Sequence, residues 1–168
     1  MLPLRYLAGY PEDLQRQVRE AIAQSRLTPM LRSRYPGTHP VRSDGALFDY
    51  TLALKNRFLR NAEPPARVLF DSRLQLTAHA LGINGRLPRM QGNRIKWKRE
   101  IRVASVFKDA PPEFLRMIVV HELAHLKESE HDRAFYRLCN HMEPAYHQLE
   151  FDLRLYLTQR ELSGLPGA

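Results

Sequence analysis

Three histidines constrain the fold of this chain more than any other feature of its sequence. His121 and His125 belong to the segment His-Glu-Leu-Ala-His, and helical residues four apart share a face, about 6 Å apart along the axis. The third, His131, would face about 240° away from His125 if the helix continued. It reaches the other two only if the helix ends near Leu126 or Lys127 and the chain turns back. The sequence therefore predicts a helix, a short turn and a second helix that meet at one point.

This spacing predicts a zinc site. Three neutral imidazoles bind Zn²⁺ and leave a fourth tetrahedral position for water, which is typical of a catalytic site. Glu122 lies about 100° round the helix from His121, where it can act as general base for that water. We therefore expect His121, His125 and His131 to be the metal ligands and Glu122 the catalytic residue. Glu128 is the rival third ligand, because it shares a helix face with His121, but it lies about 10 Å along the axis.

Some aspects of the site stay open in the sequence. The alternative to a metal site is a surface helix with solvated histidines, and the spacing of His131 argues against it. Residues close in sequence could stabilise an oxyanion, although packing or solvation is favoured for each: Tyr136, His141, Tyr146 and His147. The sequence does not identify the group that orients the ligand histidines.

Apolar spacing and turn residues predict an α+β order, with helices, a small sheet and then more helices. Helices are expected to begin at Pro11, near Asp44, near Asp109, at about His131 and at about Pro144. The stretch from Thr28 to Gly45, rich in proline and glycine, is expected to be a loop. Strands are expected at 67–70, at 74–78 and within 94–107, with a break in the chain between Gly82 and Pro88. We expect residues 1–63 to form an N-terminal helical segment packed on a domain of residues 64–168.

The charge of the chain favours anionic partners, since its formal net charge is +8. Cations crowd around Trp97 between Arg86 and Arg102: Arg86, Arg89, Arg94, Lys96, Lys98, Arg99 and Arg102. We favour a solvated strand face for this segment and keep nucleic-acid binding as the alternative. Cys139 is the only cysteine, and neither a signal peptide nor a membrane-spanning run is visible. We expect a cytoplasmic protein with no membrane partner.

The residues around the motif resemble a known family. Val119-Val120-His121-Glu122-Leu123-Ala124-His125-Leu126, followed by His131-Asp132-Arg133-Ala134-Phe135-Tyr136, is similar to the YgjP-like and SprT-like zinc metallopeptidases. The resemblance covers roughly residues 94–157. It implies the same three zinc ligands, Glu122 as acid/base, and Phe135 as a core anchor. It also implies a zincin-like fold with an active-site helix, a small antiparallel sheet and a following helix that returns the third ligand. Many relatives carry Trp-Gly-Ser-Cys where Met90 to Arg94 stand here.

Motif and resemblance together predict a zinc-dependent metallopeptidase. Peptide bonds would be hydrolysed by a zinc-bound water that Glu122 activates, and the substrate would be a protein or peptide. The alternative is a nucleic-acid-associated protein whose zinc site is structural or vestigial. A third possibility is a zinc hydrolase of other amides.

Overall fold

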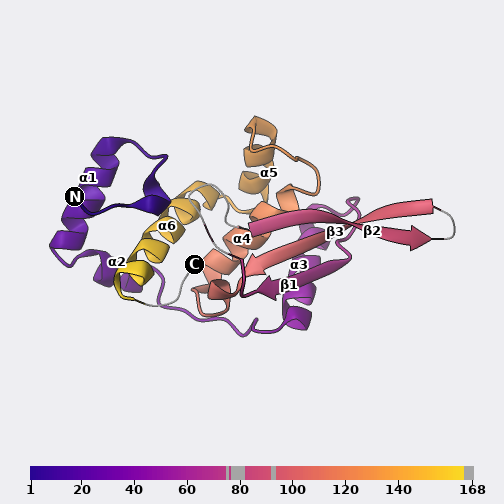
Figure 1. Cartoon of the computed structure of the whole chain (residues 1–168), viewed down its shortest axis with the longest axis horizontal. Coiled ribbons are helices and arrows are strands. Elements are labelled where there is room, and N and C mark those ends of the chain that lie inside the picture. Colours follow the sequence, from indigo (N-terminus) through magenta and orange to yellow (C-terminus); the bar gives the residue numbers. More distant parts are fainter. Residues whose placement is uncertain (75, 77–81, 92–93, 165–168) are drawn as a thin grey trace.

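The computed structural model describes residues 1–74, 76, 82–91 and 94–164 of the chain. Helices precede and follow a small sheet (Figure 1). In chain order the elements are η1 (Arg5–Leu7), α1 (Glu12–Ala23), α2 (Leu27–Arg34), α3 (Asp44–Phe58), β1 (Arg67–Asp71), β2 (Gly82–Gln91), β3 (Arg94–Ala104), η2 (Ser105–Lys108), α4 (Pro112–Ala124), α5 (Arg133–Met142) and α6 (Tyr146–Leu162). The predicted α+β order is confirmed.

Two of the early helices begin where sequence signals place them. Helix α1 follows Pro11 and carries two acids in its first turn, which suits the positive end of the helix dipole. Helix α3 is capped by Ser43, whose hydroxyl accepts from the backbone N–H of Ala46 at 3.1 Å. Asp44 instead accepts from the N–H of Phe70 at 2.9 Å and so ties α3 to β1.

Helix α2 lies inside the stretch that was expected to be a loop, so that expectation is wrong. Pro29 falls in the first turn of α2, where a missing N–H costs no helical hydrogen bond. Leu27 and Leu31 are buried, and they fix the helix through packing rather than through intrinsic propensity. The guanidinium of Arg34 then forms a 2.8 Å ion pair with the buried carboxylate of Asp152, on α6.

The sheet has three strands in the order β1-β3-β2. Strand β1 pairs with β3 in parallel, from Arg67 opposite Glu100 to Asp71 opposite Ala104, so the predicted antiparallel sheet is wrong for this pair. Strand β2 pairs antiparallel with β3. β1 and β2 do not pair with each other, because β3 lies between them, and they run in opposite directions. Strand order depends on long-range contacts, which local patterns do not encode.

Other strand predictions also need correction. The stretch from Gly82 to Pro88, expected to be a break, belongs to β2, and Pro88 is tolerated there because β2 is an edge strand. Strand β3 ends at Ala104, and the next four residues form η2 rather than more strand. The strand expected at 74–78 falls largely outside the described residues, and residues 74 and 76 are not in a strand.

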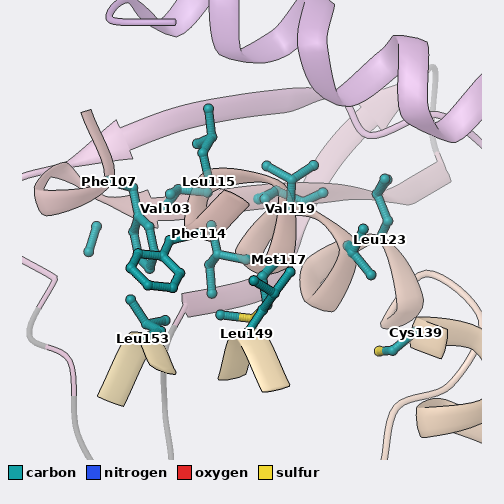
Figure 2. Packing of buried hydrophobic residues seen from close by; sticks show 14 of the residues in the cluster. Val103, Phe107, Phe114, Leu115, Met117, Val119, Leu123, Cys139, Leu149 and Leu153 are labelled. Atoms are coloured by element: carbon teal, nitrogen blue, oxygen red, sulfur yellow. The ribbon is translucent and has the colours of Figure 1, made fainter. Parts of the chain in front are cut away.

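Helix α4 lies at the centre of the main core and contacts both β2 and β3 on one side and α6 on another. Figure 2 shows Phe114 and Met117 of α4 beside Leu149 and Leu153 of α6, while Leu115 and Val119 extend away from α6. Nearly every residue of α4 is buried. A helix buried all round is a rigid support for a site, because its side chains have few alternative positions.

A second apolar cluster joins the N-terminal helices to α6. Its buried members are Leu4, Leu7, Val18, Leu27, Leu31 and Leu155. The guanidinium of Arg154, also on α6, donates to the backbone carbonyl of Tyr6 at 3.1 Å. The division of the chain at residue 64 stays a prediction. In the part of the chain that is described, no helix combines the length and apolar character needed to cross a membrane.

Candidate metal centre

The chain turns back after α4 as the histidine spacing requires. Helix α4 ends at Ala124, slightly earlier than expected, and the N–H groups of Lys127 and Glu128 both donate to the carbonyl oxygen of Ala124, at 3.1 and 3.0 Å. Helix α5 is then capped by Asp132, whose carboxylate accepts from the N–H of Phe135 at 3.0 Å. His131 directly precedes this cap, so the cap fixes the backbone that carries it.

The turn brings the three histidines together. One ring nitrogen from each of His121, His125 and His131 lies within 4.8 Å of the others. The Nε2 atoms of His125 and His131 are 2.9 Å apart. Ligand nitrogens of a tetrahedral zinc ion lie about 3.3 Å apart, given Zn–N bonds of about 2.0–2.1 Å. The cluster could therefore hold a metal ion after small movements of the rings.

Phe135 supports all three imidazoles. Its ring centroid lies 5.0, 4.6 and 4.8 Å from those of His121, His125 and His131. Phe135 is fully buried in the main core, as the core-anchor role implied. The first turn of α5 thus supplies an aromatic ring that packs against one side of the histidine cluster.

Two groups orient histidines of the cluster, and sequence reasoning had identified neither in this role. The Nδ1–H of His125 donates to the backbone carbonyl of Glu128 at 2.9 Å, which leaves its Nε2 lone pair for a metal. The Nδ1 of His121 lies 2.7 Å from the buried hydroxyl of Tyr146, on α6. Tyr146 therefore lies behind His121 as an orienting group, and Glu128 contributes its carbonyl to the centre.

Burial controls the charge state of the site. It lowers the pKa of His121 to about 3, and the positive charges of His125 and His131 act in the same direction. Burial also lowers the pKa of His125, with smaller contributions from His131 and Arg99. Neutral imidazoles are the form that binds metals, so the lowered pKa values of His121 and His125 fit a metal ion. Burial raises the pKa of Glu122 to about 8.

The other candidate residues lie at different distances from the cluster. The ring centroid of Tyr136 is 6.5 Å from that of His131. His147 lies beside Tyr136, with ring centroids 5.3 Å apart, and within 3.2 Å of the amide nitrogen of Asn140. His141 packs against Phe58 of α3 instead.

Comparison with known proteins gives a family and a relative. Residues 62–156 match the family described as YgjP-like, metallopeptidase domain. The chain is 58% identical, over 162 residues, to a protein of Escherichia coli (strain K12) named UTP pyrophosphatase; the match covers 96% of this chain and 97% of that relative. No solved structure gives a significant match.

This relative corrects the predicted function. Its name describes action on UTP, so the predictions of a peptidase and of a protein or peptide substrate are wrong. The alternative of a nucleic-acid-associated protein, with a structural or vestigial zinc site, is overturned by the same finding. The cause is chemical: a metal ion and a carboxylate base serve the hydrolysis of many bonds, and the ligand set does not specify which bond is cleaved.

Proposed function

This chain belongs to the YgjP-like metallopeptidase domain family, and from its similarity to the UTP pyrophosphatase we propose that it is a metal-dependent hydrolase of UTP. In the proposed reaction the oxygen of a water molecule bonds to the α-phosphorus, and the bond from that phosphorus to the bridging oxygen breaks. UMP and pyrophosphate leave. The observation that carries the proposal is the cluster of three histidines next to Glu122, on a buried helix, in a chain this similar to the relative.

We propose that His121, His125 and His131 hold one Zn²⁺ ion. The support is a set of three imidazoles whose ring nitrogens lie within 4.8 Å of one another, and burial lowers the pKa of two of them, His121 and His125. When bound, such an ion supplies Lewis acidity, which offsets phosphate charge and lowers the pKa of a nearby water.

Glu122 is the base in this proposal. One of its carboxylate oxygens would take the proton of the attacking water, and the carboxyl group would later give it up to solvent or to the leaving pyrophosphate. Burial raises the pKa of Glu122 to about 8, whereas a positive charge beside the carboxylate lowers it. The pKa of the base in this proposal therefore depends on whether the histidines hold a metal ion.

The surrounding residues keep this unit in place. Tyr146 and the carbonyl of Glu128 orient two of the imidazoles through their Nδ1 atoms. Phe135 packs against the three imidazole rings and excludes water from that side of the cluster. Preorganised groups of this kind reduce the rearrangement required when the reaction occurs.

The test is hydrolysis of UTP by the purified protein supplied with Zn²⁺, or with Mg²⁺, Mn²⁺ or Co²⁺, following UMP and pyrophosphate by chromatography. Glu122→Gln should retain bound metal and lose at least about 100-fold in turnover, because the base is gone. His131→Ala should lose metal as well as turnover. The absence of UMP with every metal, or full turnover in Glu122→Gln, would overturn the proposal.

Glu128→Gln is the matched control. It removes the negative charge of the Glu128 side chain but keeps the backbone carbonyl that contacts His125. Turnover and metal content should match the wild type, measured by the same chromatography and by elemental analysis.

A further inference from the structure

An open cavity of about 160 Å³ lies between α2, the start of α4 and the last turns of α6. Figure 1 shows α2 beside the C-terminal end of α6, drawn in yellow. Phe114 lines the cavity and precedes His121 by seven residues, which is about 10 Å along the axis of α4. The cavity is therefore separate from the histidine cluster, and the proposed hydrolysis of UTP does not use it.

Three aromatic rings line the cavity. The ring of Phe114, which is fully buried, is flanked by Tyr35 and Tyr156, whose ring centroids lie 4.6 and 5.3 Å from its own. Both tyrosines are half-buried. The hydroxyl of Tyr35 donates to the carboxylate of Asp152, which also pairs with Arg34 at 2.8 Å. Tyr35 is thus left to contact a ligand through its ring, and the three rings form a surface against which a further ring can pack.

The polar part of the lining is positively charged. Among the described residues that line the cavity, Arg32 and Arg160 are the charged ones, and none is acidic. Arg32 lies in the last turn of α2, is exposed and has no ion pair or hydrogen bond from its side chain within the described part of the chain. The guanidinium of Arg160 lies 5.7 Å from the ring centroid of Tyr156. An anionic group at the edge of the cavity would meet these charges without an opposing carboxylate in the lining.

The size and chemistry of the cavity together define a class of ligand. A cavity of about 150 Å³ in another protein holds one benzene molecule, so a single six-membered ring fits here. Small-molecule sites are typically apolar, with a few polar groups that fix the orientation of the ligand. A guanidinium binds a carboxylate or a phosphate through two parallel hydrogen bonds. The lining therefore matches one aromatic ring that carries one anionic group.

We propose that this cavity binds a small aromatic anion. The ring of the ligand packs against Phe114, Tyr35 and Tyr156, and its carboxylate or phosphate pairs with Arg32. The site goes beyond the proposed function, because neither the histidine cluster nor Glu122 takes part in it.

The experiment is a titration of the metal-free protein followed by two-dimensional NMR of its backbone amides. Without metal, no contact between a ligand carboxylate and a metal ion contributes to the binding. Benzoate should shift the signals of the residues that line the cavity, with a Kd of about 1 mM for a ligand this small. Benzamide, which keeps the ring and lacks the charge, should bind about 5-fold to 10-fold more weakly. Phenyl phosphate should also bind, and the tighter of the two anions identifies the preferred anionic group.

Two variants separate the contribution of the charge from that of the cavity. Arg32→Gln should weaken benzoate about 5-fold to 10-fold and leave benzamide unchanged. Its matched control is Arg26→Gln, because Arg26 is an exposed arginine that precedes α2 and lies outside the lining. Thr28 lines the cavity from the first turn of α2, so Thr28→Trp should fill the space and abolish the binding of both ligands.

Three results would overturn the inference. One is the absence of shifts in the lining residues with about 10 mM benzoate. Another is an equal affinity of Arg32→Gln and the wild type for benzoate, and the third is a set of shifts centred on His121 instead of Phe114. Arg32 is exposed, so its replacement decides the matter even if Thr28→Trp lowers the Tm of the ligand-free protein.

Discussion

Replacement of Tyr146 by Phe tests whether a residue on α6 controls the metal centre. The Tyr146 hydroxyl lies 2.7 Å from Nδ1 of His121, and the tyrosine is fully buried. Burial raises the pKa of Tyr146, so the hydroxyl is neutral and can accept from the imidazole. Phenylalanine keeps the ring and removes only this oxygen.

The size of the effect follows from burial. In the tautomer that leaves Nε2 of His121 for a metal, its Nδ1–H loses its acceptor when the hydroxyl is removed, and water has little access there because His121 is 8% exposed. A buried donor without a partner costs about 1–3 kcal/mol. Loss of an orienting group behind a ligand histidine lowers metal affinity about 10-fold to 100-fold, or about 1.4–2.7 kcal/mol, which agrees with that cost.

The assay is a Zn²⁺ titration against a chromophoric chelator, with Tm measured in the presence and absence of metal. Tyr156→Phe is the control on the same helix, because the Tyr156 hydroxyl accepts from Arg160 at 3.4 Å rather than from a histidine. Tyr146→Phe should bind Zn²⁺ about 10-fold or more weakly, and Tyr156→Phe as tightly as the wild type. Affinity of Tyr146→Phe within about twofold of the wild type would refute the reasoning.

Three further predictions concern stability. In metal-free protein, burial keeps the pKa of His121 at about 3, against 6.5 ordinarily, so the unfolded chain binds a proton that the folded chain does not. Stability should therefore fall as pH drops below 6.5, approaching about 1.4 kcal/mol per unit, in urea denaturation; an equal slope in His121→Asn would contradict this. Asp132→Ala removes the cap of α5 and should cost about 0.5–2 kcal/mol by the same method, with weaker metal binding because His131 precedes the cap; an unchanged urea midpoint would count against it. Asp152→Ala removes the buried carboxylate that pairs with Arg34 and should lower the free energy of unfolding by about 2–3 kcal/mol. Its metal affinity in the chelator titration should be unchanged. A loss of metal affinity as large as in Asp132→Ala would show that the ion pair acts on the site.

Local sequence signals placed the helix and turn that bring the histidines together. Helical periodicity put His121 and His125 on one face, and the polar residues before Asp132 indicated the turn that returns His131. Both signals act over a few residues. The orienting groups could not be found in this way, because Tyr146 is 25 residues from His121 and any residue has a carbonyl to offer.

The type of bond that would be hydrolysed also could not be predicted from the motif. Three histidines and Glu122 predict a cation and a base, but amides and phosphoanhydrides both react with water under those conditions. The net charge of +8 indicated an anionic partner, and a nucleotide carries the same phosphate charges as a nucleic acid. The net charge of a protein indicates the sign of its partner's charge but not the size of that partner.

The placement of α6 in both apolar clusters has a consequence for the order in which the protein can form during synthesis. Helices α1 and α2 emerge early, yet their cluster includes Leu155, and Arg34 pairs with Asp152. The histidine cluster likewise lacks the contact between His121 and Tyr146 until α6 has been synthesised. Arg34 and its partner Asp152 are 118 residues apart in the chain, so neither end of the molecule reaches its final packing until translation has passed α6. During that interval a nascent chain exposes the apolar faces of its first helices, and such surface promotes aggregation until α6 covers it.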